Sequence, residues 1–315
     1  MRAVVFRGGK LKYEPTYEAN STVDHIAVRV LKAGICETDL QLIQGYMGFS
    51  GVLGHEFVGV AESGEYEGQR VVGEINCSCH QCETCRTGRA NHCPYRTVIG
   101  ILNHDGAFAD RVWVPEANLH PIPDTVTDDE AVFVEPLAAA FQIGDQLDLR
   151  QFESVVVLGD GRLGNLCAQV LHAAGKQPTV VGKHLAKLSR LEQLGIKTEL
   201  LSDVALSKCV DLVVDCTGSA SGLTTAMDLV RPRGTIVLKT TTATEHGPNL
   251  AQVVIDEITL VGSRCGPFPK AIRALETDSV DVTSLITSRF PLEDAIHAFE
   301  VAQQKDQLKV MLDVA

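Results

Sequence analysis

A short run of cysteines carries the strongest chemical signal in the sequence. Four of them stand within 15 residues, separated by two, two and seven positions: Cys79, Cys82, Cys85 and Cys93. Four soft sulfur ligands on one compact loop are typical of a closed, tetrahedral zinc site. Because protein atoms fill every position around such an ion, we expect this zinc to stabilise the loop and to take no part in chemistry.

The cysteine run has two other interpretations, a redox-active disulfide and a zinc module that binds nucleic acid. Cys77, His80 and His92 also lie close enough to exchange with the four chosen ligands. The N-terminus shows no export signal, which indicates a reducing cytoplasm and disfavours a disulfide. The 40 acidic residues outnumber the 28 basic ones, and the net charge of −12 at pH 7 offers little attraction to phosphate.

A second group of potential metal ligands lies outside the cysteine run. Cys36 and Thr38 stand in one short segment, and His55 and Glu56 in the next. A further carboxylate, Glu135, follows later in the chain. A thiol, an imidazole and a carboxylate with one position left free form the usual ligand set of a catalytic zinc. Spacing alone leaves the matter open, because a single cysteine is more often a core residue and a His-Glu pair more often structural.

Three glycines mark a nucleotide-binding turn in the second half of the chain. A buried strand is expected at 155–158, and a helical pattern follows the turn. In such a turn the first glycine permits the tight bend, the second lets a pyrophosphate approach the backbone, and the third lets helix and strand pack closely. The alternative is a glycine-rich turn without a ligand. The residues that we expect at the cofactor are Gly159, Gly161, Arg162, Leu163 and Gly164.

The end of the next strand bears on the choice of cofactor. Sites that prefer NAD usually carry a carboxylate there, about 20 residues after the turn, to hold the ribose hydroxyls. This chain has Gly182 followed by Lys183 and His184. Glycine leaves room where the carboxylate would stand, and the basic side chains suit a 2′-phosphate, so we expect NADP rather than NAD. The alternative is that these are solvated charges at the start of a helix.

The elements that must position these residues fall into two parts. Residues 1–120 contain short β-branched runs punctuated by glycine, which is typical of a small β-barrel or sandwich, and the proline-rich stretch 121–124 is expected to be a linker. From residue 154 onwards, short apolar runs alternate with segments of helical period, which indicates a doubly wound parallel sheet of the α/β class. A helix at 292–299 and a strand at 308–312 close the chain.

Composition agrees with two globular domains. The 315 residues are about twice the usual domain length. Hydrophobic residues make up 45% of the chain and charged residues 22%, which are ordinary values for a globular protein. No apolar run reaches the roughly 18 residues needed to cross a bilayer. We therefore expect a small-molecule partner, and neither nucleic acid nor a membrane.

Taken jointly, these motifs resemble the zinc-dependent alcohol dehydrogenases of the medium-chain dehydrogenase/reductase superfamily over essentially the whole chain. The resemblance implies a GroES-like β-barrel catalytic domain, formed by residues 1–121 and 286–315. It also implies a Rossmann dinucleotide-binding domain of residues 122–285, with the active site in the cleft between the two. Family members form homo-oligomers, so a dimer or a tetramer is expected. The segments that carry the resemblance are 34–39, 54–56, 79–93, 135–137, 159–164 and 308–312.

Carried over by position, the resemblance makes Cys36 and His55 zinc ligands. Glu56 and Glu135 match two carboxylates that serve as ligand or near neighbour, and which of them binds directly stays open. A glutamate at 135 in place of cysteine is similar to the polyol and threonine dehydrogenase branches.

The proton relay shows one departure from the family pattern. Thr38 matches the hydroxyl that passes the substrate proton onwards. Many relatives carry a histidine three residues later, where this chain has Gln41. Water would then have to take over the outer part of the relay.

The function implied by the resemblance is transfer of hydride between an alcohol or polyol and NAD(P), which yields an aldehyde or ketone. One alternative is an NADPH-dependent aldehyde reductase that uses the same residues in the opposite direction. An alternative of another class is a catalytically silent sensor that binds zinc and nucleotide and needs no open metal position. No motif indicates the particular substrate, because specificity lies in a few side chains on loops.

Overall fold

The computed structural model describes residues 1–19, 24–239 and 249–315, and it folds into two compact units. The first unit comprises Met1–Glu135, Phe268–Asp278 and Val282–Ala315, and the second comprises Pro136–Pro267 and Ser279–Asp281. The first unit therefore extends to residue 135, beyond the boundary at 121 that the sequence suggested. A physical reason is Arg70, whose guanidinium donates to the Pro123 carbonyl at 2.9 Å and to Asp128 at 2.8 Å.

The first unit is built mainly from antiparallel strands. Its largest sheet has the order β10-β6-β5-β3-β18-β17, with β9 also paired to β3, and two smaller sheets have the orders β2-β1-β4 and β7-β8. The strands are β1 (Ala3–Arg7), β2 (Lys10–Glu14), β3 (His25–Ile35), β4 (Gly51–Val52), β5 (Glu56–Ala61), β6 (Arg70–Gly73), β7 (Asn76–Cys77), β8 (Thr97–Val98), β9 (Arg111–Pro115), β10 (Leu119–Pro121), β17 (Ile286–Pro291) and β18 (Lys309–Asp313).

Short helices connect these strands. The α-helices of the first unit are α1 (Glu37–Ile43), α2 (Glu83–Arg86), α3 (Asp128–Ala131), α9 (Phe268–Glu276) and α10 (Ala295–Ala302). Single 3₁₀ turns are η1 (Tyr46–Gly48), η2 (Ala90–His92), η3 (Glu116–Asn118), η5 (Thr283–Leu285) and η6 (Leu292–Asp294).

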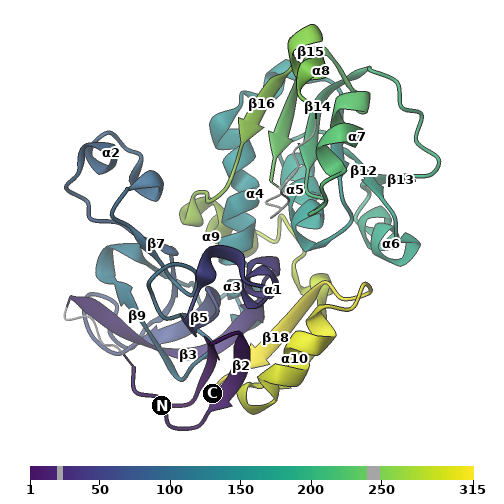
Figure 1. Ribbon diagram of the computed structural model, residues 1–315. Coiled ribbons are helices and arrows are strands. Elements are labelled where there is room, and N and C mark those ends of the chain that lie inside the picture. The colour runs from purple at the N-terminus through teal and green to yellow at the C-terminus, as the bar shows by residue number, and fades with distance from the viewer. Residues whose placement is uncertain (20–23, 240–248) are drawn as a thin grey trace. The chain divides into compact units, whose positions relative to one another are not determined.

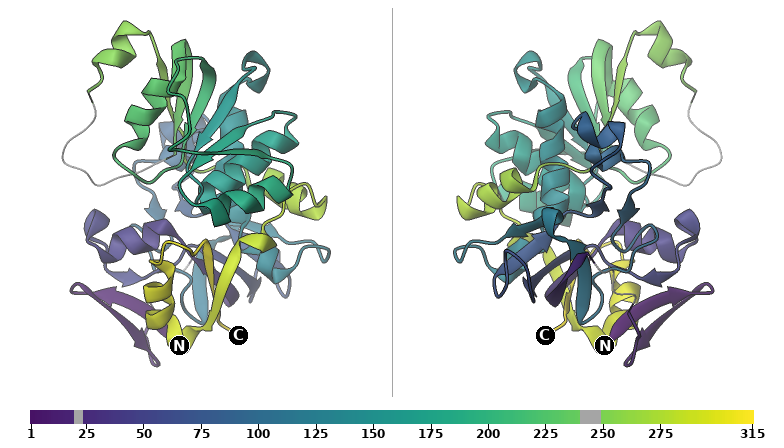
Figure 2. Two further views of the ribbon diagram at one scale, coloured as in Figure 1. Left: turned by 90° about the vertical axis from the view of Figure 1, so that its right-hand side faces the viewer. Right: turned by 90° about the vertical axis from the view of Figure 1, so that its left-hand side faces the viewer.

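The C-terminal segment returns to the first unit, as the family resemblance implies. Strand β18 pairs antiparallel with β3, bringing Val310 opposite Ile35, and parallel with β17. Near the N-terminus, Arg2 donates to the Val314 carbonyl at 2.6 Å, and both chain ends lie at the same end of this unit (Figure 2). The last strand therefore lies directly beside the strand that leads into Cys36.

The second unit is a parallel sheet with helices on both faces (Figure 1), which confirms the doubly wound α/β prediction. Within the described residues its order is β13-β12-β11-β14-β15-β16, and every pairing is parallel. The elements are α4 (Val134–Gln146, which starts in the first unit), η4 (Leu149–Gln151), β11 (Val155–Leu158), α5 (Arg162–Ala173), β12 (Thr179–Gly182), α6 (Leu185–Gln193), β13 (Lys197–Leu200), β14 (Val210–Asp215), α7 (Gly222–Leu229), β15 (Val230–Leu238), α8 (Ala251–Ile255) and β16 (Thr259–Gly262).

Apolar residues from the strands and the covering helices form the core of this sheet. Leu158, Val213 and Ile236 lie on three neighbouring strands and are at most 1% exposed. Burial on this scale contributes about 25 cal/mol for each Å² of apolar surface removed from water. The strand order matters for the site. Strands β11 and β12 are parallel neighbours, so their carboxyl-terminal ends lie side by side. Among the described helices, none is long and apolar enough to span a bilayer.

Candidate active site and metal centres

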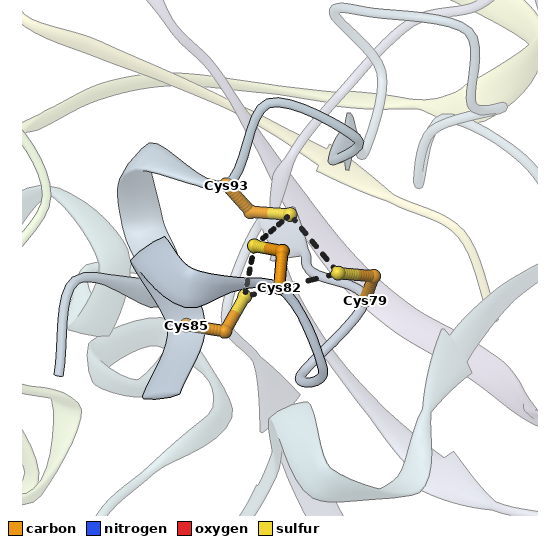
Figure 3. A group of neighbouring side chains, drawn as sticks. All are labelled: Cys79, Cys82, Cys85 and Cys93. Carbon is orange, nitrogen blue, oxygen red and sulfur yellow. Dashed lines mark hydrogen bonds between the residues drawn. The ribbon is translucent and has the colours of Figure 1, made fainter. Parts of the chain in front are cut away.

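The four-cysteine loop gathers its sulfur atoms into one cluster (Figure 3). Neighbouring Sγ atoms are 3.4 Å apart for Cys82 and Cys85, 3.5 Å for Cys79 and Cys93, 3.8 Å for Cys82 and Cys93, and 4.0 Å for Cys79 and Cys85. A tetrahedral zinc with Zn–S bonds of about 2.3 Å holds its sulfur atoms about 3.8 Å apart. The donor set therefore fits a zinc ion in chemistry and in size.

Helix α2 and its backbone amides help to arrange the thiols. Cys82 precedes the first residue of α2 and Cys85 lies within it, so the short helix places both side chains on one side (Figure 3). The backbone amide of Cys79 lowers the pKa of Cys93 to about 6. The backbone amide of Cys85 likewise lowers the pKa of Cys82. Lower pKa values favour the thiolate form, which is the form that binds metal. Burial and the neighbouring thiols raise the pKa of Cys85 to about 12, so the cluster does not hold four thiolates without an ion.

Cys77 behaves differently from the four clustered cysteines. It is buried, and its Sγ is not among the ligand atoms of the cluster. Burial raises the pKa of Cys77 to about 12, so the side chain is a neutral thiol. His80 and His92 also lie outside the cluster, so the structure brings together the four cysteines chosen from the spacing.

A second cluster joins Cys36, His55 and Glu56, whose ligand atoms all lie within 4.8 Å of one another. Cys36 follows β3 and precedes α1, whereas Glu56 is the first residue of β5. Strands β3 and β5 are antiparallel neighbours with Gly34 opposite Glu56, so the pairing brings the two segments together. His55 is only 2% exposed, and its Nδ1 atom faces the buried carboxylate of Asp39 at 3.5 Å. A thiol, a buried imidazole and a carboxylate form a donor set that fits a zinc ion.

Asp39 ties the two ligand segments together and was not identified from the sequence. This carboxylate is fully buried and accepts hydrogen bonds from the Cys36 amide at 2.8 Å and from the Gly54 amide at 3.2 Å. Its Oδ1 atom lies 3.5 Å from His55 Nδ1. Burial lowers the pKa of His55, but Asp39 and Cys36 act in the opposite direction and raise that pKa well above its ordinary value. Asp39 thus orients the imidazole as carboxylates do beside metal-binding histidines.

Lys309 is the second buried partner that sequence reasoning missed. Its ammonium group forms an ion pair with Glu56, and the two side chains are 0% and 1% exposed. The same Nζ atom lies 5.5 Å from the centre of the Phe133 ring. Space around the pair is so limited that a Cβ at Gly34 would lie 3.0 Å from Glu56 Oε2 and 3.1 Å from Lys309 Cδ. The last strand of the chain therefore holds the carboxylate of the cluster in place.

Thr38, Gln41 and Glu135 are the remaining residues that the sequence associates with this site. The Thr38 hydroxyl is 3.8 Å from Cys36 Sγ, at the beginning of α1. Gln41 lies on the same helix and donates to Glu37 at 3.1 Å. Glu135 lies in the first turn of α4, and it is not among the residues whose ligand atoms form the Cys36 cluster.

The glycine turn has the geometry expected of a dinucleotide cradle. Gly159 has a φ of +111°, in the region that favours glycine, and a Cβ at Gly164 would collide with the carbonyl of Gly159. Nothing lies within 4 Å of a Cβ at Gly161, so the backbone is open to an approaching phosphate there. Helix α5 begins at Arg162 and runs through Leu163, with its N-terminus at the turn. Backbone amides at a helix N-terminus bind phosphate groups, so the turn fits a pyrophosphate.

The end of β12 differs from the sequence-based expectation. Gly182 does not leave an empty space, because the carboxylate of Asp160 occupies it: a Cβ at Gly182 would lie 2.5 Å from Asp160 Oδ2. Asp160 Oδ2 accepts hydrogen bonds from the amides of Lys183 and His184, both at 2.7 Å. The Lys183 side chain is exposed, and His184 Nδ1 lies 3.1 Å from each Asp160 oxygen.

Two family models match the chain. An alcohol dehydrogenase GroES-like domain matches residues 22–124, and a glucose dehydrogenase C-terminus matches residues 129–314. Together the two models span almost the whole sequence.

Full-length relatives agree with these matches. An L-threonine 3-dehydrogenase of Mesorhizobium japonicum is 30% identical over 316 residues, and a sorbitol dehydrogenase of Halalkalibacterium halodurans is 28% identical over 312 residues. Each alignment covers 91% of this chain and 91% of the relative. A candidate zinc-binding dehydrogenase of Sinorhizobium meliloti 1021, bound to NADP, has a similar structure, with a TM-score of 0.88, 26% identity and 99% coverage of both chains.

The sequence matches, the fold and the two clusters of potential metal ligands thus all indicate the same protein family. The glucose dehydrogenase model alone covers more than half of the chain, and the threonine dehydrogenase covers nearly all of it. The chain belongs to the zinc-dependent alcohol dehydrogenases of the medium-chain dehydrogenase/reductase superfamily and is an NAD(P)-dependent oxidoreductase.

Proposed function

We propose that this enzyme oxidises a small alcohol or polyol to an aldehyde or ketone at the Cys36 cluster, with NADP preferred to NAD. The observation that carries the proposal is the convergence of Cys36, His55 and Glu56 within 4.8 Å, in a chain that also has an open glycine turn at Gly161. The relatives that act on sorbitol and on threonine, both of which carry hydroxyl groups, support a polyol-type substrate.

Two zinc ions are assigned to the chain under this proposal. Cys36 and His55 hold the catalytic ion, with Glu56 as a ligand or close neighbour and Glu135 as a second carboxylate near the site. The structural ion is held by the four clustered cysteines, which leave no position for substrate. Asp39 contacts His55 and Lys309 contacts Glu56, so these two residues would position the ligands.

The protein groups around the cluster prepare the substrate for loss of a proton and a hydride. When bound, zinc supplies a Lewis acid that lowers the pKa of the substrate hydroxyl, and the nicotinamide supplies the hydride acceptor. Thr38, whose oxygen lies 3.8 Å from Cys36 Sγ, relays the hydroxyl proton: its oxygen accepts that proton while its own hydroxyl proton passes to water. Gln41 does not titrate, so water carries the proton beyond Thr38.

The cofactor is held by the glycine turn and by the end of β12. Gly159, Gly161 and Gly164 shape the turn, and the amides of Arg162 and Leu163 begin the helix that faces the pyrophosphate. Residue 182 carries no carboxylate of its own and is followed by the basic side chains of Lys183 and His184, although the carboxylate of Asp160 fills the space beside Gly182. The side chains of Lys183 and His184 support the preference for a 2′-phosphate.

The test is a Cys36→Ser variant compared with a Cys77→Ser control. We expect wild type to contain two zinc ions per chain and to turn over alcohols or polyols with NADP. Cys36→Ser should retain one zinc, retain binding of NADPH and lose turnover by at least about 100-fold. Cys77→Ser should retain both metals. Full turnover by the Cys36→Ser variant would overturn the assignment of the catalytic centre.

The same assays address the remaining expectations. Aldehyde reduction with NADPH is measured beside alcohol oxidation, because the two directions use the same residues. The family resemblance supports a homo-oligomer, either a dimer or a tetramer, which light scattering of the purified protein would distinguish. A cytoplasmic location is supported by a cysteine-rich chemistry that needs reduced thiols.

A further inference from the structure

The space beside Gly182 is filled by a carboxylate that comes from the glycine turn. Asp160 lies between Gly159 and Gly161, directly after β11, and is 8% exposed. Gly182 ends β12, the parallel neighbour of β11, with Leu158 opposite Val181 in the register. The side chain of Asp160 crosses from one strand end to the other and occupies the volume that a side chain at 182 would need.

The two positions exclude each other sterically. A Cβ at Gly182 would lie 2.6 Å from Asp160 Cβ and 2.8 Å from its Cγ, both far inside contact distance. The backbone of Gly182 does not have a positive φ, so its glycine is required by space and not by conformation. One of the two positions can therefore carry a carboxylate, and in this chain that position is 160.

This location matters because of what dinucleotides place there. In Rossmann sites the carboxylate at the end of the second strand accepts hydrogen bonds from the adenosine ribose, and a 2′-phosphate needs cations in the same place. Asp160 brings a negative charge to that position although residue 182 is glycine. Asp160 also accepts hydrogen bonds from the backbone amides of Lys183 and His184. These two amides are then not available to donate to a 2′-phosphate. The Nδ1 atom of His184 lies 3.1 Å from both carboxylate oxygens of Asp160.

We propose that Asp160 is a specificity-determining residue of the cofactor site, which replaces the missing carboxylate at the end of β12 and opposes binding of a 2′-phosphate. The inference rests on the proposed function for the location of the cofactor. Under this proposal, the basic side chains of Lys183 and His184 attract the 2′-phosphate and the negative charge of Asp160 repels it. The repulsion limits the preference for NADP over NAD.

The first experiment measures binding and not turnover. Isothermal titration of 2′,5′-ADP and 5′-AMP gives the ratio of their dissociation constants for wild type and for Asp160→Asn, which keeps an acceptor oxygen and removes the charge. We expect the ratio to shift about tenfold towards 2′,5′-ADP, the factor that corresponds to loss of one nearby like charge in a partly solvated site. Asp148→Asn is the matched control. Asp148 lies before the amino-terminal end of β11, whereas Asp160 follows its carboxyl-terminal end, so this variant should leave the ratio unchanged.

The outcomes separate the inference from the proposed function. A wild-type ratio that favours 5′-AMP would contradict the NADP preference and would still allow Asp160→Asn to shift the ratio. If Asp160 only supports the fold, both ligands weaken equally in Asp160→Asn, and the inference is wrong. A shift towards 5′-AMP would also overturn it, since it would mean that the carboxylate assists the phosphate.

A second experiment uses the steric exclusion. Gly182→Asp alone should weaken both ligands at least about tenfold, because its Cβ would lie 2.5 Å from Asp160 Oδ2. The double variant Asp160→Gly/Gly182→Asp moves the carboxylate to the other strand end. We expect it to recover 5′-AMP binding to within about threefold of wild type, a coupling that only neighbouring positions show. A double variant that binds no better than Gly182→Asp would show that position 160 does not supply this carboxylate.

Discussion

At the scale of single residues, the pair formed by Lys309 and Glu56 shows how the cluster is held. Both side chains are almost completely buried, and each is the charged partner of the other. A buried charge without a partner is costly, whereas a buried pair replaced as a whole is often tolerated. The pair therefore couples the last strand of the chain to the metal-ligand cluster.

Lys309→Met should consequently destabilise the protein. We expect a loss of about 3–5 kcal/mol in the free energy of unfolding, because Glu56 is left as an unpaired buried charge. Urea denaturation of the metal-free protein, in which no ion pairs with Glu56, measures it. Lys305→Met, an exposed lysine just before the same strand, is the matched control and should change stability by less than about 0.5 kcal/mol. The double variant Lys309→Met/Glu56→Gln should regain most of the loss, and equal losses in single and double variants would contradict a charge-pair explanation.

At the scale of elements, the four-cysteine loop depends on metal more than on packing. Helix α2 has four residues and no buried side chain, so little apolar surface is available to hold it. Zinc binding is then the main source of folding free energy for the loop.

Cys93→Ser should release one zinc ion per chain and leave the loop open to proteolysis. Cys77→Ser, the control, removes a nearby buried thiol whose sulfur is outside the cluster, and it should keep the full metal content. Metal analysis by mass spectrometry together with limited trypsin digestion compares them. Equal zinc contents in the two variants would refute the assignment of Cys93.

In the glycine turn, Gly164 and Gly161 have different roles: one permits packing and the other leaves space for phosphate. Gly164→Ala should destabilise the second unit, since its Cβ would collide with the Gly159 carbonyl and separate helix α5 from β11. Gly161→Ala meets no atom within 4 Å and should leave the thermal midpoint within about 2 °C. The same variant should weaken NADPH binding at least about tenfold, because the methyl group points into the space kept for phosphate. Unchanged NADPH affinity would mean that the pyrophosphate lies elsewhere.

At the scale of the whole molecule, the stability of this acidic chain depends on ion pairs between its carboxylates and its less numerous basic groups. Asp129 on α3 forms ion pairs with Lys32 on β3 and Arg289 on β17. Arg289 and Lys32 lower the pKa of Asp129 from 3.8 to about 2. A lowered pKa in the folded state contributes stability above the unfolded pKa of 3.8, and this contribution is lost as the pH falls towards 2.

Asp129→Asn should therefore lower stability by about 1–2 kcal/mol at pH 7. The difference between variant and wild type should shrink as the pH falls below 4 and vanish near pH 2. Urea denaturation of both proteins at several pH values measures this difference, in which contributions common to both cancel. A difference that stays constant down to pH 2 would show that the ion pairs do not stabilise this unit.

Much of the fold could be predicted because its signals are local in the sequence. The alternation of strands and helices after residue 154 predicted the parallel sheet, but the segment that forms β13 carries no strand signal of this kind. Residues 197–200 are Lys, Thr, Glu and Leu, and none of them is fully buried, because β13 lies at the edge of the sheet. An edge strand lacks the apolar run by which central strands are recognised.

The sequence by itself predicted the donor chemistry and the glycine turn, since the cysteine spacing and the glycine spacing are patterns within short segments. Only the tertiary structure decided how these groups are supported. Asp39 meets His55, Glu56 meets Lys309 253 positions later, and Asp160 takes the space of residue 182. Such contacts arise from strand pairing between distant segments, and a linear sequence contains no spacing that reports them.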